Sequence, residues 1–207
     1  MKVIIFGSTG RTGKYLIQFT LEAGFQVTAF ARNPDAVTIR HPRLIVFQGD
    51  ATNTNAVESA MEGQDAVIFA VGTDLGETNL RQTAMQNIIG AMHKHQVRRI
   101  VGIGGMGILQ ASEDLKIFET KTFPQEYKAV SEDHNAAYEL LLKSGLDFTF
   151  VCPPTIADGP LTGKYTTEEN YPPHGQFVID TADLADFIVK ELSEPRYIGK
   201  RVGITAI

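Results

Sequence analysis

The sequence predicts an α/β protein with a doubly wound parallel sheet between two layers of helices, a three-layer single domain. Short runs of apolar, β-branched residues alternate along the chain with stretches of helical periodicity. The apolar runs are continuous rather than alternating, which is typical of strands covered on both faces. The chain has 207 residues, and a domain takes roughly 100–200 residues. We therefore expect residues 1–207 to form one domain.

Apolar runs and helical patterns place the elements in order. Strands are expected at residues 3–6, 26–31, 44–47, 66–71, 99–103, 147–152 and 201–204. Helices are expected at residues 13–23, 55–61, 78–93, 125–142 and 181–192. Gly24, Gly63 and Gly145 stand where the first, second and fourth helices should stop, and Asp180 stands where the fifth should begin. Alternation of strand and helix predicts right-handed crossovers between parallel neighbours.

Two segments, residues 104–124 and 153–175, lack clean periodicity, and the second is rich in proline. Each follows a strand, so both are expected at the carboxyl edge of the sheet, where open α/β sheets bind ligands. We expect these loops to build the substrate site. Residues 164–167 and 176–179 are expected to pair as a small hairpin.

A glycine-rich loop follows the first strand and opens the first helix. It reads Gly7-Ser8-Thr9-Gly10-Arg11-Thr12-Gly13, with GxxGxxG spacing. In this context the glycines permit a tight turn, a close approach of the backbone to a diphosphate, and close packing of helix on sheet. Thr9 and Thr12 add hydroxyl groups that can donate to phosphate. The loop therefore predicts a Rossmann-type dinucleotide site; the alternative is a tight turn without a ligand.

Basic residues near this loop favour an anionic ligand. Arg11 and Lys14 fall in the first helical turn, where each cation opposes the helix dipole at a cost of about 0.3–1 kcal/mol. A bound anion would reverse that penalty, whereas in the alternative both side chains reach into solvent.

The end of the second strand indicates which cofactor is bound. Arg32 stands where NAD-selective sites commonly place an acid. Because arginine can pair with a 2′-phosphate, we expect NADP(H) to be preferred over NAD(H). The alternative is a surface arginine paired with Asp35.

Turns after the third and fourth strands complete the expected cofactor site. Asp50 and Ala51 are expected beside the adenine, with helix capping as the alternative role of Asp50. Val71, Gly72 and Thr73 are expected beside the ribose.

These motifs, together with the run Pro153-Pro154-Thr155-Ile156-Ala157-Asp158-Gly159-Pro160-Leu161-Thr162-Gly163-Lys164-Tyr165, resemble the NAD(P)H-binding atypical short-chain dehydrogenases/reductases. That group includes NmrA-like proteins and the flavin and biliverdin reductases, and the resemblance covers nearly the whole chain. It implies that Pro154, Thr155 and Ile156 lie near the nicotinamide carboxamide. It also implies hydride transfer to a flavin (FMN, FAD or riboflavin), a bilin or a quinone.

The chain departs from the family pattern at the substrate side. Gly104-Gly105 stands where the family has a serine, and Thr155 stands where it has a histidine after the double proline. Thr155 is therefore a candidate catalytic residue. His134, next to Asp133, is a second candidate, with a structural hydrogen bond as the alternative.

The usual tyrosine and lysine pair of short-chain dehydrogenases, YxxxK, does not occur in the sequence. Its absence argues against alcohol, ketone and epimerase chemistry, which need a proton donor beside the reacting oxygen. Flavin reduction needs only positioning, with the proton supplied by water. We therefore expect an NADPH-dependent reductase; the alternative is a non-catalytic NADP(H)-sensing regulator of NmrA-like type.

The amino-acid composition limits the classes of partner that we expect. A net charge of −5 gives no general attraction for nucleic acid or anionic membranes, and one cysteine, Cys152, excludes an intrachain disulfide and a zinc cluster. We expect a cytoplasmic monomer that binds no metal and takes a small-molecule acceptor.

Overall fold

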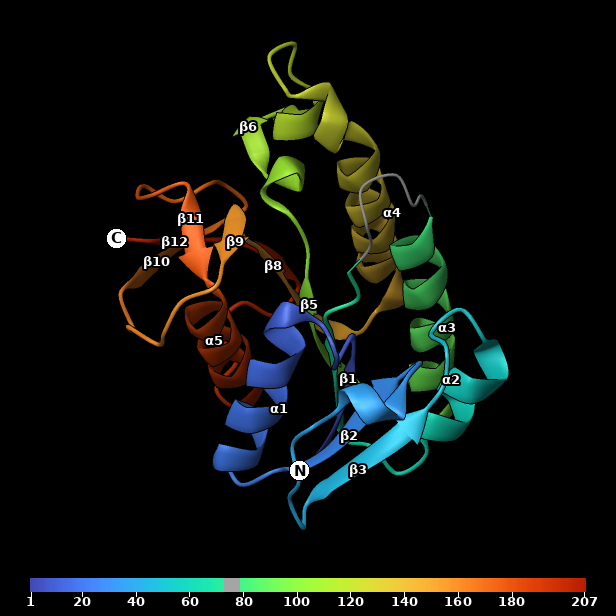
Figure 1. The fold of residues 1–207 in the computed structure, drawn as a ribbon. Coiled ribbons are helices and arrows are strands. Elements are labelled where there is room, and N and C mark those ends of the chain that lie inside the picture. The colour runs from blue at the N-terminus through green and yellow to red at the C-terminus, as the bar shows by residue number, and fades with distance from the viewer. Residues whose placement is uncertain (73–78) are drawn as a thin grey trace.

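The computed structural model describes residues 1–72 and 79–207 (Figure 1). Thr73 and the first residue of the helix expected at 78–93 lie outside the described residues. None of the helices in the described part of the chain is long and apolar enough to cross a membrane.

Eight strands form the central sheet, in the order β10-β12-β8-β5-β4-β1-β2-β3. They are β1 (Lys2–Phe6), β2 (Gln26–Ala31), β3 (Leu44–Gln48), β4 (Ala66–Phe69), β5 (Arg99–Ile103), β8 (Asp147–Cys152), β10 (Tyr165–Glu169) and β12 (Lys200–Ala206). All neighbours are parallel except β10, which runs antiparallel to β12. The strand order reverses between β1 and β4, which creates a crevice at their carboxyl ends.

Helices cover both faces of this sheet (Figure 1). The helices are α1 (Arg11–Glu22), α2 (Thr54–Met61), α3 (Leu80–Lys94), α4 (Lys128–Ser144) and α5 (Thr181–Ser193). Alternate residues of β1 enter two separate cores: Ile4 and Phe6 pack beneath α2, α3 and α4, and Val3 and Ile5 pack beneath α1 and α5. The predicted three-layer, doubly wound fold is therefore confirmed.

The hairpin expected between residues 164–167 and 176–179 is wrong. β10 instead covers the edge of β12, and β11 (Val178–Asp180) pairs in parallel with β9 (Thr155–Ala157). Pairing with β12 lets Tyr165 pack edge-on against Phe187 of α5 and donate a hydrogen bond to Asp186, 2.8 Å away. A local hairpin would have left the edge of β12 open.

The first irregular segment, residues 104–124, contains short elements of its own. They are the 3₁₀ turns Met106–Ile108 and Ile117–Glu119 and the small hairpin of β6 (Gln110–Ser112) and β7 (Leu115–Lys116). A further 3₁₀ turn, Gln125–Tyr127, precedes α4, and another, Pro34–Ala36, follows β2. The helix expected at 125–142 thus begins three residues later than predicted.

Arg201 of β12 connects residues 104–124 to the sheet through hydrogen bonds. Its buried guanidinium donates to the carbonyl of Ile108 and, over 3.0 Å, to the side chain of Gln110, and it lies 4.8 Å from the centre of the Tyr138 ring. The backbone of Gln110 also donates to Asn170, 2.9 Å away. The two irregular segments are therefore held together at one edge of the sheet.

Candidate cofactor and acceptor site

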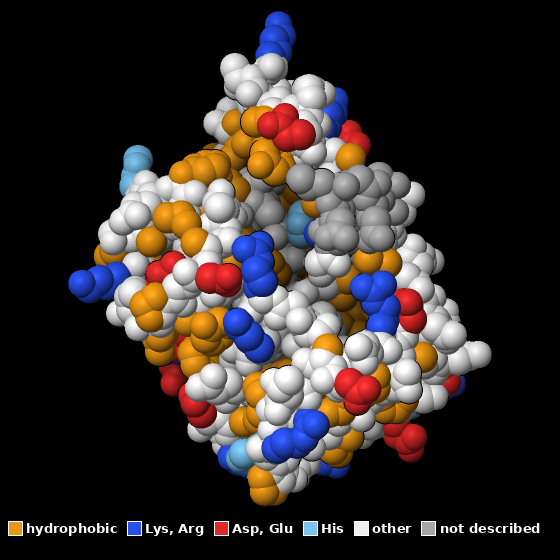
Figure 2. Space-filling view, in the orientation of Figure 1, with side chains coloured by type: hydrophobic (Ala, Val, Ile, Leu, Met, Phe, Trp, Pro, Cys, Tyr) orange, Lys and Arg blue, Asp and Glu red, His pale blue; other side chains and the backbone are white. Residues whose placement is uncertain are grey.

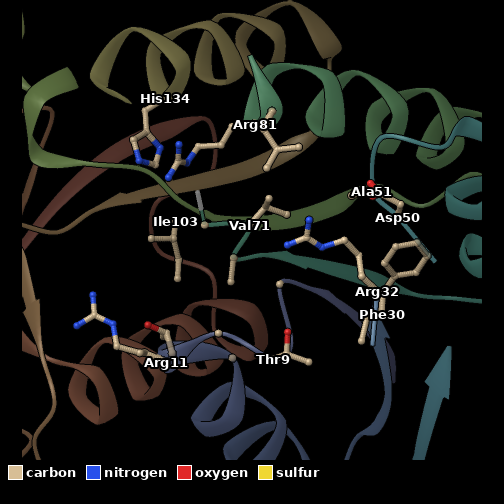
Figure 3. A pocket seen from close by; sticks show the side chains of 18 of the residues that line it. Thr9, Arg11, Phe30, Arg32, Asp50, Ala51, Val71, Arg81, Ile103 and His134 are labelled. Atoms are coloured by element: carbon tan, nitrogen blue, oxygen red, sulfur yellow. The ribbon is translucent and has the colours of Figure 1, made fainter. Parts of the chain in front are cut away.

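A cavity of about 580 Å³ opens at the carboxyl ends of β1, β2, β4 and β5. Figure 2 shows this face hollowed near its centre, with basic side chains beside the hollow. The cavity runs from Phe30 and Arg32 at one end to Ile103 and His134 at the other (Figure 3), and Ile156 also lines it. Its volume falls within the range of about 300–1,000 Å³ that is usual for small-molecule sites.

The glycine loop forms the floor between these ends. Gly7 has a φ of +83°, and a Cβ there would lie 2.1 Å from the carbonyl oxygen of Ala70; a Cβ on Gly13 would lie 2.4 Å from the carbonyl oxygen of Gly7. Those two glycines are required by the protein's own packing. Gly10 is not, because its nearest contact would be an ordinary 3.4 Å.

The start of α1 is suited to an anion. Gly10 is the N-cap residue, and the described structure gives it no side-chain cap and places no acid in the first turn. The first residues of the helix, Arg11, Thr12 and Gly13, line the cavity with Gly10, and no described side chain accepts from their N–H groups. Such a helix start, with its partial positive charge, is a ready-made phosphate site.

The two cations of the first helical turn behave differently. Arg11 lines the cavity and donates from Nη1 to the carbonyl oxygen of Ile156 in β9, 3.1 Å away. Lys14 instead lies 5.2 Å from the centre of the Tyr15 ring. Arg11 therefore links the start of α1 to β9, and the solvent-facing alternative holds for Lys14 rather than for Arg11.

Arg32 and Asp50 mark the end of the cavity near β2. The hydrogen bonds that Thr52 donates to Asp50 Oδ1, at 2.8 Å from the backbone and 2.7 Å from the hydroxyl, lower the pKa of Asp50, and the Arg32 charge lowers it further. Asn53, not Asp50, caps α2 by accepting from Ala56. Among the residues described, no ion pair joins Arg32 to Asp35, so the guanidinium faces the cavity mouth.

Arg81 and His134 lie together at the opposite end (Figure 3). Asp133 fixes this corner, because its carboxylate accepts from the backbone N–H groups of Arg81 and Gln82 at 3.1 and 3.0 Å and from Arg81 Nη1 at 3.3 Å. Burial, together with the nearby Arg81 charge, holds the pKa of His134 well below its usual value. The imidazole is therefore neutral at pH 7.

Most of the predicted cofactor residues line this one cavity: Gly7, Thr9, Gly10, Arg11, Thr12, Gly13, Arg32, Asp50, Ala51, Val71, Gly72 and Ile156. Pro154 and Thr155 are not among the lining residues, and the Thr155 side chain is exposed on β9. The structure thus brings His134 into the cavity and leaves Thr155 outside it.

Sequence reasoning missed several lining residues: Phe30, Ala31, Ala70, Leu80, Arg81 and Ile103. The sequence does contain a pattern that could have predicted Arg81. This arginine continues the apolar face of α3 that Ala84, Ile88 and Met92 define at helical spacing, and a charge on such a face indicates a buried functional or paired group.

Known proteins share this architecture. The family model described as NAD(P)H-binding matches residues 7–195. The uncharacterised protein YwnB of Bacillus subtilis is 25% identical over 100% of this chain and 99% of its own. Several longer curated relatives match too, and the chain spans between 20% and 63% of their length.

Two solved structures are similar over their whole length. A candidate exported protein from Burkholderia pseudomallei is 29% identical, with a TM-score of 0.87 and complete coverage of both chains. A candidate NADH-flavin reductase from Streptococcus pneumoniae is 25% identical, also with a TM-score of 0.87 and complete coverage of both chains. With most of its length matched by the family model and its fold shared, the chain belongs to the NAD(P)H-binding family of atypical short-chain dehydrogenases/reductases.

Proposed function

We propose that this protein is an NADPH-dependent reductase that transfers hydride to a flavin or a similar flat conjugated acceptor, such as a bilin or quinone. The observation that carries the proposal is the continuity of one cavity, from the phosphate-binding start of α1 to an apolar wall of Ile103 and Ile156. The similarity to a candidate NADH-flavin reductase supports the same chemistry.

The choice of NADPH rests on Arg32. It follows β2 directly, lines the cavity, and has no acidic neighbour paired with it among the described residues. A planar guanidinium there suits a ribose 2′-phosphate, whereas a site for NAD usually offers a carboxylate to the 2′-hydroxyl.

The bound cofactor would supply the hydride, and the chain would supply position and a partly dry surface. The start of α1 and the backbone of Gly10 would bind the diphosphate, and Arg32 would bind the 2′-phosphate. Ile103 and Ile156 would form the apolar wall at the reacting end. Hydride transfer adds one proton and two electrons to the acceptor, and water would deliver the second proton through the open mouth.

The test is oxidation of NADPH by the purified protein, measured with riboflavin, FMN, FAD, biliverdin and menadione as acceptors. We expect turnover with at least one flavin and a lower KM for NADPH than for NADH. Reactions without protein control for direct oxidation. Tight binding of NADP(H) with no turnover on the whole panel would overturn the proposal and favour the regulatory alternative.

A further inference from the structure

His134 is a half-buried polar side chain with a buried ring nitrogen, and the proposed cofactor contacts do not use it. It stands on the face of α4 that continues into the buried residues Ala137, Tyr138 and Leu141. Its Nδ1 is buried without a hydrogen-bond partner, and neither ring nitrogen takes part in a hydrogen bond between residues that the structure describes. The ring nevertheless lines the cavity (Figure 3).

The loop after β5 leaves space for this ring. A Cβ on Gly105 would lie 3.2 Å from His134 Cδ2 and 3.5 Å from Nε2. A Cβ on the preceding Gly104 would instead meet Phe150 at 2.8 Å, inside the core. Gly105 therefore lets the imidazole lie close to the loop, at the end of the cavity that Ile103 also lines.

The charges around the ring decide what it can offer. Arg81 of α3 lies beside it, and Asp133 holds that guanidinium by an ion pair in which both side chains are buried. The Arg81 charge and burial together keep the imidazole neutral. A neutral ring has one N–H to donate, and the Arg81 charge attracts electron-rich oxygen to the same corner.

Stability alone does not explain a histidine at this position. A buried polar atom without a partner destabilises a fold, and an apolar residue of similar shape is often neutral or stabilising there. Polar groups that lie in a cavity and are unfavourable for folding tend to act on a ligand.

We propose that His134 hydrogen-bonds the carbonyl edge of the acceptor, and that this corner selects flat acceptors that carry a ring carbonyl. The inference rests on the proposed reductase function. Electron density moves onto the carbonyl oxygens and ring nitrogens of the acceptor as hydride arrives. A neutral imidazole N–H beside a fixed guanidinium stabilises that charge without giving up a proton.

The test compares His134→Phe and His134→Gln with a matched control, His95→Phe. His95 also has a buried ring nitrogen without a partner, but it caps the far end of α3 and does not line the cavity. Lumiflavin, a flavin without ribityl or phosphate groups, is the acceptor. Loss of one hydrogen bond should raise its KM about tenfold in His134→Phe. The KM for NADPH should stay unchanged in His134→Phe. The KM for lumiflavin should stay unchanged in the control variant, His95→Phe.

Two further comparisons separate a direct hydrogen bond to the acceptor from a structural effect of the substitution. His134→Gln keeps an N–H donor, so its lumiflavin KM should stay within about threefold of the wild-type value. Methylene blue is flat but has no carbonyl, so its KM should not respond to His134→Phe. The melting temperature of His134→Phe should equal or exceed that of the wild type. Equal lumiflavin KM values in the wild type and His134→Phe would overturn the proposal.

Binding keeps the two proposals distinguishable. Quenching of lumiflavin fluorescence by the NADP⁺ complex measures acceptor affinity without turnover. If the wild type binds lumiflavin but never reduces it, the reductase function fails while the role of His134 is still tested by the same variants. If His134→Phe does not fold, Gly105→Ala replaces it, since its methyl group would push the imidazole by a few tenths of an ångström. It should raise the lumiflavin dissociation constant about threefold, and an unchanged value would count against the proposal.

Discussion

Between β1 and α1 the cavity is lined mainly by glycines and short side chains of one turn, with Arg11 beside them, whereas at the His134 end long side chains come from α3 and α4. The first of these regions is built from glycines and the N–H groups at a helix start, and such residues form a continuous motif in the sequence. The second depends on the packing of two helices and on a buried ion pair whose partners, Arg81 and Asp133, are 52 positions apart in the chain.

The largest effect is expected from breaking the buried corner. Asp133→Ala removes the carboxylate beside Arg81 and the acceptor for two backbone N–H groups of α3. We expect a loss of about 3 kcal/mol in the free energy of unfolding, measured by urea denaturation. Glu132→Ala, at the exposed neighbouring position, is the control and should change stability by less than about 0.5 kcal/mol. Similar stabilities for the two variants would contradict the role of Asp133.

The glycine loop offers a matched pair at the other end. Gly13→Ala forces a methyl group within 2.4 Å of backbone that has no room to move, and should lower stability by about 2–3 kcal/mol. Gly10→Ala meets only a 3.4 Å contact at an ordinary φ of −71°. It should fold normally yet weaken NADPH binding, because its methyl group faces the diphosphate position. Calorimetry of NADP⁺ binding and thermal melting separate the two effects, and normal affinity in Gly10→Ala would argue against the assigned position.

Arg32→Ala should weaken the binding of NADPH but not of NADH. Loss of a charge-assisted contact to the 2′-phosphate costs about 2 kcal/mol, or roughly thirtyfold in the dissociation constant. Arg98→Ala, which removes an exposed arginine paired with Asp147, is the control. An equal loss for NADPH and NADH would mean that Arg32 does not read the 2′-phosphate.

The smallest effect concerns pH. His134 has a folded-state pKa well below its ordinary value of 6.5, because burial and the Arg81 charge disfavour the protonated ring. The unfolded chain therefore binds the proton first, so the stability that this residue contributes is complete above about pH 6.5 and falls as the pH drops toward the folded pKa. The slope is at most about 1.4 kcal/mol per pH unit. Denaturation at pH 7.5 and pH 5.5 should show a smaller loss for His134→Phe than for the wild type.

The same contrast explains what the sequence could and could not predict. The sheet, the helices and many of the residues that line the cavity followed from apolar periodicity and the glycine loop, because both are local patterns. The pairing of β10 with β12 joins segments far apart in the chain and was missed in favour of a local hairpin. Thr155 was proposed from its place after two prolines, yet β9 turns its side chain to solvent and directs Ile156 to the cavity. The sequence does not predict that Arg81 lies beside His134, since their meeting depends on how α3 packs on α4.

The hydrogen bond from Arg11 to Ile156 joins the start of α1, where we expect the diphosphate, to β9 on the acceptor side of the cavity. We expect a bound cofactor phosphate to draw on the same guanidinium, which would couple the position of β9 to the affinity for the cofactor. By linkage, whatever factor cofactor binding exerts on the β9 loop, the loop exerts on the cofactor.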